Sequence, residues 1–222
     1  MMRIKTIANL INNAKCVYDI GSDHAHLAIL LLQLNKTNKI VNIDKNIKPL
    51  ESGIKNLIKA NLLDRTINIK SDGFNQLSES DIILPEWIVI SGMGGLTIIE
   101  ILSKMPNQYK NANFILIPNN NEYALRKWLS ENKHKIIYEE IIIENNKYYN
   151  LIQTRITKER IDMDELQLNF GPINLTVNSD NFIEFLNFKK KLLVNSKSLD
   201  KSIEQKKYYS YIKQALGDKN DN

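Results

Sequence analysis

Apolar and polar positions alternate along the first two thirds of the chain in the order strand, helix, strand. Five short runs of β-type apolar residues each end in a polar or glycine-rich turn: 16–20, 39–44, 66–70, 87–91 and 114–117. Four segments with helical spacing follow such runs: 25–34, 49–60, 96–102 and 122–131. This βαβ alternation predicts an α/β domain built on a parallel sheet.

The pattern changes after residue 131. Two long β-rich runs, 136–144 and 147–157, are joined by Asn145-Asn146, a pair that tolerates the positive φ of a tight hairpin turn. Helical crossovers followed by a terminal antiparallel hairpin are the order expected of a class I, Rossmann-like methyltransferase sheet. A dinucleotide dehydrogenase more often continues with another helix. The pattern favours the first fold without excluding the second.

The C-terminal part of the chain has a different organisation. Periodicity fades over 161–177, where Gly171-Pro172 interrupts it, and this stretch is predicted to be a linker. Two amphipathic helices follow, separated by a turn at 195–198 in which Ser198 is expected to cap the second helix. We therefore predict a domain over 1–160 and, within 161–222, a linker and an α-helical coiled-coil hairpin.

Positive charge is concentrated in that predicted hairpin. The chain carries a net charge of +5. Between Phe185 and Gly217, eight lysines and two acidic residues give +6, which leaves −1 for the rest of the chain. This distribution indicates an acidic partner such as a nucleic acid. An ordinary solvated helix surface is the alternative.

The single cysteine and the N-terminal segment favour a cytoplasmic protein. Cys16 has no second cysteine to pair with and lies in an apolar run, so a buried structural thiol is expected. Residues 1–13 have helical apolar spacing but no apolar block of signal-peptide or membrane-spanning length. We expect this segment to form a short helix that packs on the domain.

Candidate chemistry lies at the carboxyl ends of the predicted strands, where doubly wound sheets bind their ligands. The first strand ends in Asp19-Ile20-Gly21-Ser22-Asp23, in which Gly21 permits a tight turn. The further glycines of a pyrophosphate-binding loop are absent, and a carboxylate at position 23 would repel phosphate. A cationic ligand without phosphate, such as S-adenosylmethionine, suits Asp19 and Asp23 better. A plain helix N-cap is the alternative for Asp23.

The next three strand ends extend this pattern. Asp44 closes the second strand at a spacing suited to accepting hydrogen bonds from ribose hydroxyls, and Lys45 follows it. Asp72-Gly73 ends the third strand, where the carboxylate could accept from an adenine amino group. Gly92-Met93 ends the fourth, where a flat base could lie against the backbone. The alternative is a simple turn at Asp72-Gly73 and a plain strand-to-helix loop at Gly92-Met93.

Other common catalytic arrangements are missing from the sequence. It contains three histidines and one cysteine, in no metal-binding spacing, and neither a P-loop nor a G-x-S-x-G motif. We therefore expect no metal, no P-loop NTPase and no α/β-hydrolase.

Several motifs together resemble the bacterial tRNA (adenine-N1)-methyltransferases, a family that modifies nucleotide 22 in the D-arm of tRNA. They are the segment 19–25, Asp72-Gly73, Gly92-Met93-Gly94-Gly95, Pro118-Asn119, the segment 125–129 and Phe170-Gly171-Pro172. The resemblance covers most of the chain and includes a C-terminal helical coiled coil. His26 and Ala28 depart from the Tyr and Pro that the family favours, and the helical hairpin is short.

The resemblance implies methyl transfer from S-adenosylmethionine to N1 of an unpaired, flipped-out adenine. Neutral adenine carries no proton at N1, so the reaction needs alignment and nearby negative charge rather than a general base. Asp23, His26 and Asn119 are the candidates for orienting adenine. The expected cofactor residues are Asp19, Gly21, Ser22, Asp44, Lys45, Asp72, Gly73, Gly92 and Met93. The expected tRNA contacts are Arg126, Lys189, Lys190, Lys191, Lys197, Lys206 and Lys207.

A monomer that binds tRNA, and neither a metal nor a membrane, is the expected state. Two alternatives remain open at this point. The first is an RNA-binding module that keeps the fold without catalysis, against which the three strand-end carboxylates argue. The second is a methyltransferase for another RNA position or for a small molecule.

Overall fold

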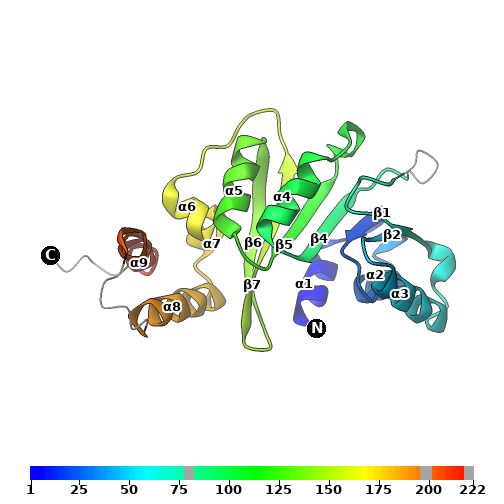
Figure 1. Cartoon of the computed structure of the whole chain (residues 1–222), viewed down its shortest axis with the longest axis horizontal. Coiled ribbons are helices and arrows are strands. Elements are labelled where there is room, and N and C mark those ends of the chain that lie inside the picture. The colour runs from blue at the N-terminus through cyan, green and yellow to red at the C-terminus, as the bar shows by residue number, and fades with distance from the viewer. Residues whose placement is uncertain (78–82, 196–201, 218–222) are drawn as a thin grey trace.

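The computed structural model describes residues 1–77, 83–195 and 202–217 (Figure 1). Within them, one mixed sheet has the strand order β3-β2-β1-β4-β5-β7-β6. The strands are β1 (Ala14–Ile20), β2 (Thr37–Asp44), β3 (Thr66–Lys70), β4 (Trp87–Met93), β5 (Asn113–Pro118), β6 (His134–Glu144) and β7 (Lys147–Ile156).

Two features of this order place the protein among the class I methyltransferase folds. β1 pairs in parallel with both β2 and β4, so the strand order reverses beside β1. β7 inserts antiparallel between β5 and β6, because its register pairs Leu116 with Ile152 on one side and Glu139 with Ile152 on the other. The terminal antiparallel hairpin predicted from the sequence is confirmed.

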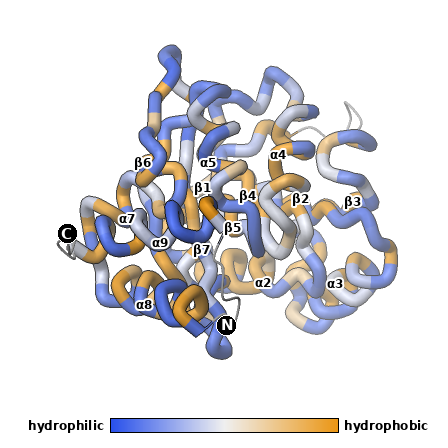
Figure 2. The backbone as a smooth tube through the Cα atoms, turned by 60° about the vertical axis from the view of Figure 1, so that its left-hand side comes forward, coloured by the Kyte–Doolittle hydropathy of each residue, from blue (hydrophilic) through white to orange (hydrophobic). Residues whose placement is uncertain are grey.

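Helices cover both faces of the sheet. One face packs against α1 (Met2–Leu10), α2 (His26–Gln33) and α3 (Ile47–Lys59). The other packs against α4 (Gly95–Ser103) and α5 (Glu122–Glu131). The short 3-10 helices η1 (Leu63–Arg65) and η3 (Asn107–Tyr109) lie in the connections. The inner strands β4 and β5 carry fully buried apolar residues, and Figure 2 shows that much of the outer turns is hydrophilic, as a two-sided core requires.

The segment expected to be a linker is partly helical. It forms α6 (Glu165–Phe170) and α7 (Pro172–Val177), which pack on α5 and β6. Asp164 caps α6 through a capping box with Gln167, and Gly171 has a φ of +92°, which separates the two helices. Helices of six residues are too short to show a clear 3.6-residue period, which is why the sequence pattern missed them.

The predicted helical hairpin is present as α8 (Asp180–Asn195) and α9 (Ile203–Ala215). Ser202 caps α9 through a capping box with Gln205; the expected cap, Ser198, lies outside the described residues. Both helices share a core with the sheet, because Phe182, Leu186 and Ile212 pack against Ile141 of β6. A boundary near residue 160 stays a prediction, and any such boundary crosses continuous packing. No helix in the described part of the chain is long and apolar enough to span a membrane.

Candidate active site

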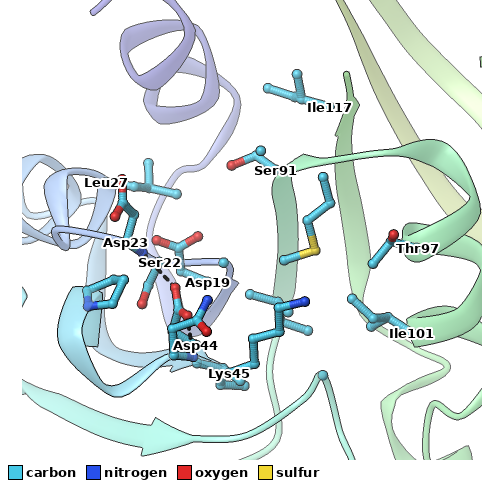
Figure 3. Close-up of a pocket in the computed structure, with 18 of the residues that line it drawn as sticks. Asp19, Ser22, Asp23, Leu27, Asp44, Lys45, Ser91, Thr97, Ile101 and Ile117 are labelled. Atoms are coloured by element: carbon cyan, nitrogen blue, oxygen red, sulfur yellow. Dashed lines mark hydrogen bonds between the residues drawn. The ribbon is translucent and has the colours of Figure 1, made fainter. Parts of the chain in front are cut away.

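A cavity of about 520 Å³ opens at the carboxyl ends of β1, β2 and β4, where the strand order reverses. It contains all nine predicted cofactor residues, and Asp23 and His26 as well. The first four strands bring these residues together, because the loops after β1, β2, β3 and β4 emerge at one edge of the sheet. Figure 3 shows Asp19, Asp23 and Asp44 gathered on one side of this cavity, with Ser91 and Thr97 across from them.

The turn after β1 depends on a glycine. Gly21 has a φ of +83°, which L side chains rarely adopt. A Cβ at this position would lie 2.6 Å from Cε of Met93 and 2.9 Å from the carbonyl oxygen of Ser91. Gly21 therefore allows the β1 turn to approach the end of β4, and Met93 fills the space above it.

The acidic side chains supply the dominant charge on the β1–β2 side of the cavity. Asp19 is only 3% exposed, and its carboxylate makes no hydrogen bond or ion pair with any described residue. Burial, reinforced by the nearby carboxylates of Asp44 and Asp23, raises the pKa of Asp19 to about 7. Desolvation and like charges both disfavour the ionised form. A cationic ligand in the cavity would relieve both effects.

Asp44 is held in place by the two loops that flank it. Its Oδ2 accepts a hydrogen bond from the backbone N–H of Asp23 at 3.3 Å, and its Oδ1 accepts one from Asn46 N–H at 2.8 Å (Figure 3). The carboxylate is thereby fixed at the carboxyl end of β2 before any ligand binds. Such a fixed acceptor suits a pair of ribose hydroxyls.

The cavity fits S-adenosylmethionine better than a phosphate-bearing cofactor. Four carboxylates line it, those of Asp19, Asp23, Asp44 and Asp72. Its two side-chain cations are Lys45 and Arg3, and Arg3 is paired with Glu144. A sulfonium and an ammonium group complement such a surface, whereas a pyrophosphate would be repelled. Among the described residues, no cluster of three His, Cys, Asp or Glu side chains could hold a metal ion.

The three residues expected to orient adenine lie in two places. Asp23 and His26 are exposed on the lining of the cofactor cavity. Asn119 does not line it, but lines a second cavity that shares Gly92 and Arg3 with the first. The N-cap of α2 is Ala25, which has a left-handed backbone and no side-chain cap, so the N-cap interpretation of Asp23 is wrong. The Asp23 carboxylate is therefore left free of that structural task.

The N-terminal helix contributes a wall of the cavity that the sequence analysis missed. Arg3, Ile4 and Ile7 of α1 line it. Arg3 donates from Nε to Glu144 Oε2 at 2.8 Å, and its guanidinium lies 4.0 Å from the centre of the Tyr149 ring. These contacts hold α1 against the β6–β7 hairpin. The amphipathic pattern of residues 1–13 predicts the helix, but no local signal predicts that it reaches the site.

The expected tRNA contact of Arg126 is wrong. This residue was expected to contact tRNA phosphates, but its side chain is fully buried. Its Nε donates to Glu139 at 2.9 Å, its Nη2 to Asn150 at 3.0 Å, and its Nη1 to backbone carbonyls at the end of α6. All of its nitrogens are engaged inside the protein, so Arg126 joins α5, the terminal hairpin and α6.

The predicted lysines lie on the helical hairpin. Lys191, Lys206 and Lys207 are exposed, and Lys189 and Lys190 are partly buried. The Lys189 Nζ lies 5.3 Å from the centre of the Phe185 ring, and Lys207 lies similarly over Tyr211. Lys197 falls outside the described residues. A tRNA contact at these positions stays a prediction.

The sheet order, the reversal beside β1 and the acidic cavity at that point together define a class I S-adenosylmethionine-dependent methyltransferase. The family follows from sequence comparison. A model of the TrmK family, described as tRNA (adenine(22)-N(1))-methyltransferase, matches residues 17–221. The chain belongs to this family, and it is an enzyme that methylates N1 of adenine 22 in tRNA.

Individual relatives agree with this assignment. A provisionally named tRNA methyltransferase of Mycoplasma genitalium is 35% identical over 177 residues, which cover 76% of this chain and 78% of the relative. The tRNA (adenine(22)-N(1))-methyltransferase of Bacillus subtilis is 26% identical over 170 residues, covering 76% and 70% of the two chains. M. capricolum TrmK, solved with the cofactor product S-adenosylhomocysteine, is 29% identical and superimposes with a TM-score of 0.87, covering 98% and 97% of the two chains.

Proposed function

We propose that the cavity at the ends of β1, β2 and β4 holds S-adenosylmethionine for the methylation of tRNA. The observation that carries this assignment is the buried Asp19 carboxylate, which has no partner among the described residues and is flanked by two further carboxylates. When bound, S-adenosylmethionine supplies an electrophilic methyl group on a positively charged sulfur. The acidic wall therefore meets a ligand of opposite charge.

The proposed cofactor residues have different roles, which follow from their positions in the cavity. Asp44, already fixed by two backbone N–H groups, would accept hydrogen bonds from the ribose hydroxyls. Asp19 and Asp23 would balance the positive groups of the cofactor. Asp72, exposed after β3, would accept from the amino group of the cofactor's adenine. Gly21 and Gly92 would let the ligand lie close to the backbone, and the partly buried Met93 would cover it.

The acceptor adenine is proposed to bind where the two cavities meet, beside Gly92. Gly92 has a φ of +79°, and a Cβ built on it would meet no atom within 4 Å, so the backbone there is open to a flat base. Asn119 on one side and His26 on the other would orient the base through its polar edge. Since N1 presents a free lone pair, these groups need only hold the base and need not remove a proton.

The helical hairpin is proposed to grip tRNA phosphates with Lys189, Lys191, Lys206 and Lys207, which add to its positive field. The protein is proposed to act as a monomer in the cytoplasm, where tRNA is available. Sedimentation of the purified chain tests the monomer.

The cofactor site is tested by calorimetry with Asp44→Ala. Loss of a hydrogen-bonded charged acceptor should weaken S-adenosylmethionine binding by about 1.5–3 kcal/mol. Asp64→Ala, an exposed carboxylate in η1 away from the cavity, is the matched control and should change nothing. Unchanged affinity of Asp44→Ala would show that the ribose does not bind at the end of β2.

The reaction is tested by incubating tRNA with labelled S-adenosylmethionine and mapping the modified nucleoside. We expect 1-methyladenosine at position 22. A label at another nucleotide would show that the chain departs from its family in target position. A label recovered only on a small molecule would overturn the tRNA assignment.

A further inference from the structure

A second cavity of about 540 Å³ lies beside the cofactor cavity and shares Arg3 and Gly92 with it. Its walls come from the tip of the β6–β7 hairpin and from α8, two segments that lie side by side (Figure 1). An adenine held at Gly92 would therefore have this cavity next to it on the side away from the cofactor. The space is large enough for more than a single base.

Aromatic side chains form the outer part of the second cavity. The ring centres of Tyr148 and Phe188 are 4.9 Å apart with 32° between their planes, and those of Tyr148 and Phe185 are 5.7 Å apart. The Tyr148 hydroxyl donates to Glu184 at 2.9 Å, which fixes its ring against α8. A preformed group of rings is thus presented by one strand and one helix.

Phe188 stands out within this group because it is 39% exposed, although it contacts Tyr148. Leaving a phenylalanine face exposed to water is unfavourable relative to burying it. A flat ligand that stacks on this face would remove that exposure. Every nucleobase offers such a face, and stacking on aromatic side chains is the usual mode by which single-stranded nucleotides bind.

The charges around the cavity fit a nucleotide. Lys147 at the hairpin tip and Lys189 on α8 lie at its lining, and Lys147 is exposed. Glu122 and Asn119 line it as well, and both can accept from an exocyclic amino group. The lysines suit a phosphate, the aromatic rings suit the plane of a base, and the hydrogen-bond acceptors suit the edge of a base. A purely apolar ligand would use only the rings.

We propose that the second cavity binds an unpaired nucleotide of tRNA that directly flanks the target adenine, with its base stacked on Phe188 and Tyr148. This inference rests on the proposed function, because it needs the target adenine at Gly92. Holding the neighbour would draw the backbone away from the duplex and keep the target adenine turned toward the cofactor. The site therefore contributes to tRNA affinity without touching S-adenosylmethionine.

Phe188 variants test the stacking. Phe188→Ala and Phe188→Leu should both weaken tRNA binding by about 5- to 150-fold, the range for loss of one base–aromatic stack. Phe188→Trp should bind as the wild type does. Affinity for S-adenosylmethionine should be equal in all four proteins. The matched control is Leu192→Ala, one turn further along α8, an apolar residue that is 53% exposed and does not line the cavity.

Modified tRNA identifies the occupant. An abasic residue placed directly 5′ or directly 3′ of the target adenine should weaken binding to the wild type at one of the two positions. The same substitution should cause no further loss with Phe188→Ala, because the stack is already gone. Phe188→Leu, which keeps apolar packing on α8, separates loss of stacking from loss of folding.

The results that overturn the inference differ from those that overturn the proposed function. If wild-type protein methylates tRNA while Phe188→Ala, Phe188→Leu and Leu192→Ala bind tRNA equally well, the second cavity does not hold a base. Additive losses from Phe188→Ala and the abasic residues would likewise place the flanking nucleotide elsewhere. If the wild type does not methylate tRNA at all, the proposed function itself fails.

Discussion

Arg126 of α5 and Glu139 of β6 form an ion pair at 2.9 Å in which both side chains are fully buried. The second carboxylate oxygen of Glu139 accepts the backbone N–H of Ile173 at 3.0 Å, at the start of α7. A Cβ on Gly171 would collide with this carboxylate. The Phe170-Gly171-Pro172 segment that resembles the family thus serves to close a buried ionic network.

Arg126→Met should destabilise the protein by about 3–5 kcal/mol, because it leaves the Glu139 charge buried without its partner. Urea unfolding measures the change. Arg160→Met, which removes an exposed ion pair with Asp162, is the control and should cost less than about 1 kcal/mol. If Arg126 contacted tRNA instead, its variant would unfold normally and lose affinity for tRNA with a reduced salt dependence.

Asp19→Asn should make folding less sensitive to pH. The pKa of Asp19 is raised to about 7 in the folded protein from 3.8, so its ionisation opposes folding as pH rises through that window. Below pH 4 the group is neutral in both states and adds no penalty. Above pH 7 the penalty is complete, with an upper limit of about 4 kcal/mol at 1.36 kcal/mol per unit. Between pH 5 and pH 8 the wild type should therefore lose stability relative to Asp19→Asn in urea unfolding.

Asp19 should also make cofactor binding depend on pH in the opposite sense. A cationic ligand favours the ionised carboxylate, so S-adenosylmethionine should bind more tightly as pH rises from 6 to 8 and should release protons as it binds. Calorimetry in buffers of different ionisation enthalpy measures this release. Equal affinity at both pH values, or an equal pH dependence in Asp19→Asn, would argue that the positive groups of the cofactor bind elsewhere.

The chemical step should be insensitive to pH once both substrates are bound. No proton leaves N1 of adenine, so single-turnover rates of the saturated complex should stay nearly constant between about pH 6.5 and 8.5. His26→Ala should alter the rate by a constant factor at every pH. His26 would instead be identified as a base by two results together. The wild-type rate would rise with pH as a single group loses its proton, and the His26→Ala rate would not change with pH.

Replacing Lys189, Lys190 and Lys191 together by Gln should weaken tRNA binding and lower its salt slope by roughly one unit or less for each lost phosphate contact. Affinity for S-adenosylmethionine should be retained, since its proposed cavity is not lined by these lysines. Filter binding across a salt series measures both quantities.

A control variant removes three exposed lysines outside both cavities: Lys55, Lys59 and Lys110. Its net charge equals that of the α8 variant, so it should lose less affinity if the position of the lysines matters. Equal losses in the two variants would mean that only the overall charge attracts tRNA.

Features within one strand or one turn could be predicted from the sequence. Asp19, Gly21 and Asp44 close successive buried strands, and parallel strands necessarily bring such ends to one edge. Arg126 was misassigned because nothing local distinguishes an exposed helix arginine from one that meets Glu139 across the fold. Its burial depends on a hairpin and two short helices that come later in the chain.

The second cavity could not be predicted for a related reason. Tyr148 and Phe188 are separated by 40 positions and meet only because α8 folds back on the hairpin tip. Each residue on its own fits an amphipathic strand or helix. Arg3 is a similar case, because it contacts Glu144, which lies 141 positions further along the chain. Contacts between segments that lie far apart in the sequence leave no periodic pattern in it.

The packing of the C-terminal helices on β6 should also protect the chain from aggregation. β6 is an edge strand of the sheet, and it contains three consecutive isoleucines, 141–143. Exposed apolar edges pair readily with other chains. Here Asn181 of α8 donates from Nδ2 to the Ile141 carbonyl at 2.9 Å, and Phe182 packs beside it. During synthesis this edge is not fully covered until both α7 and α8 have left the ribosome, so nascent chains that stop at β7 should be the species that chaperones bind.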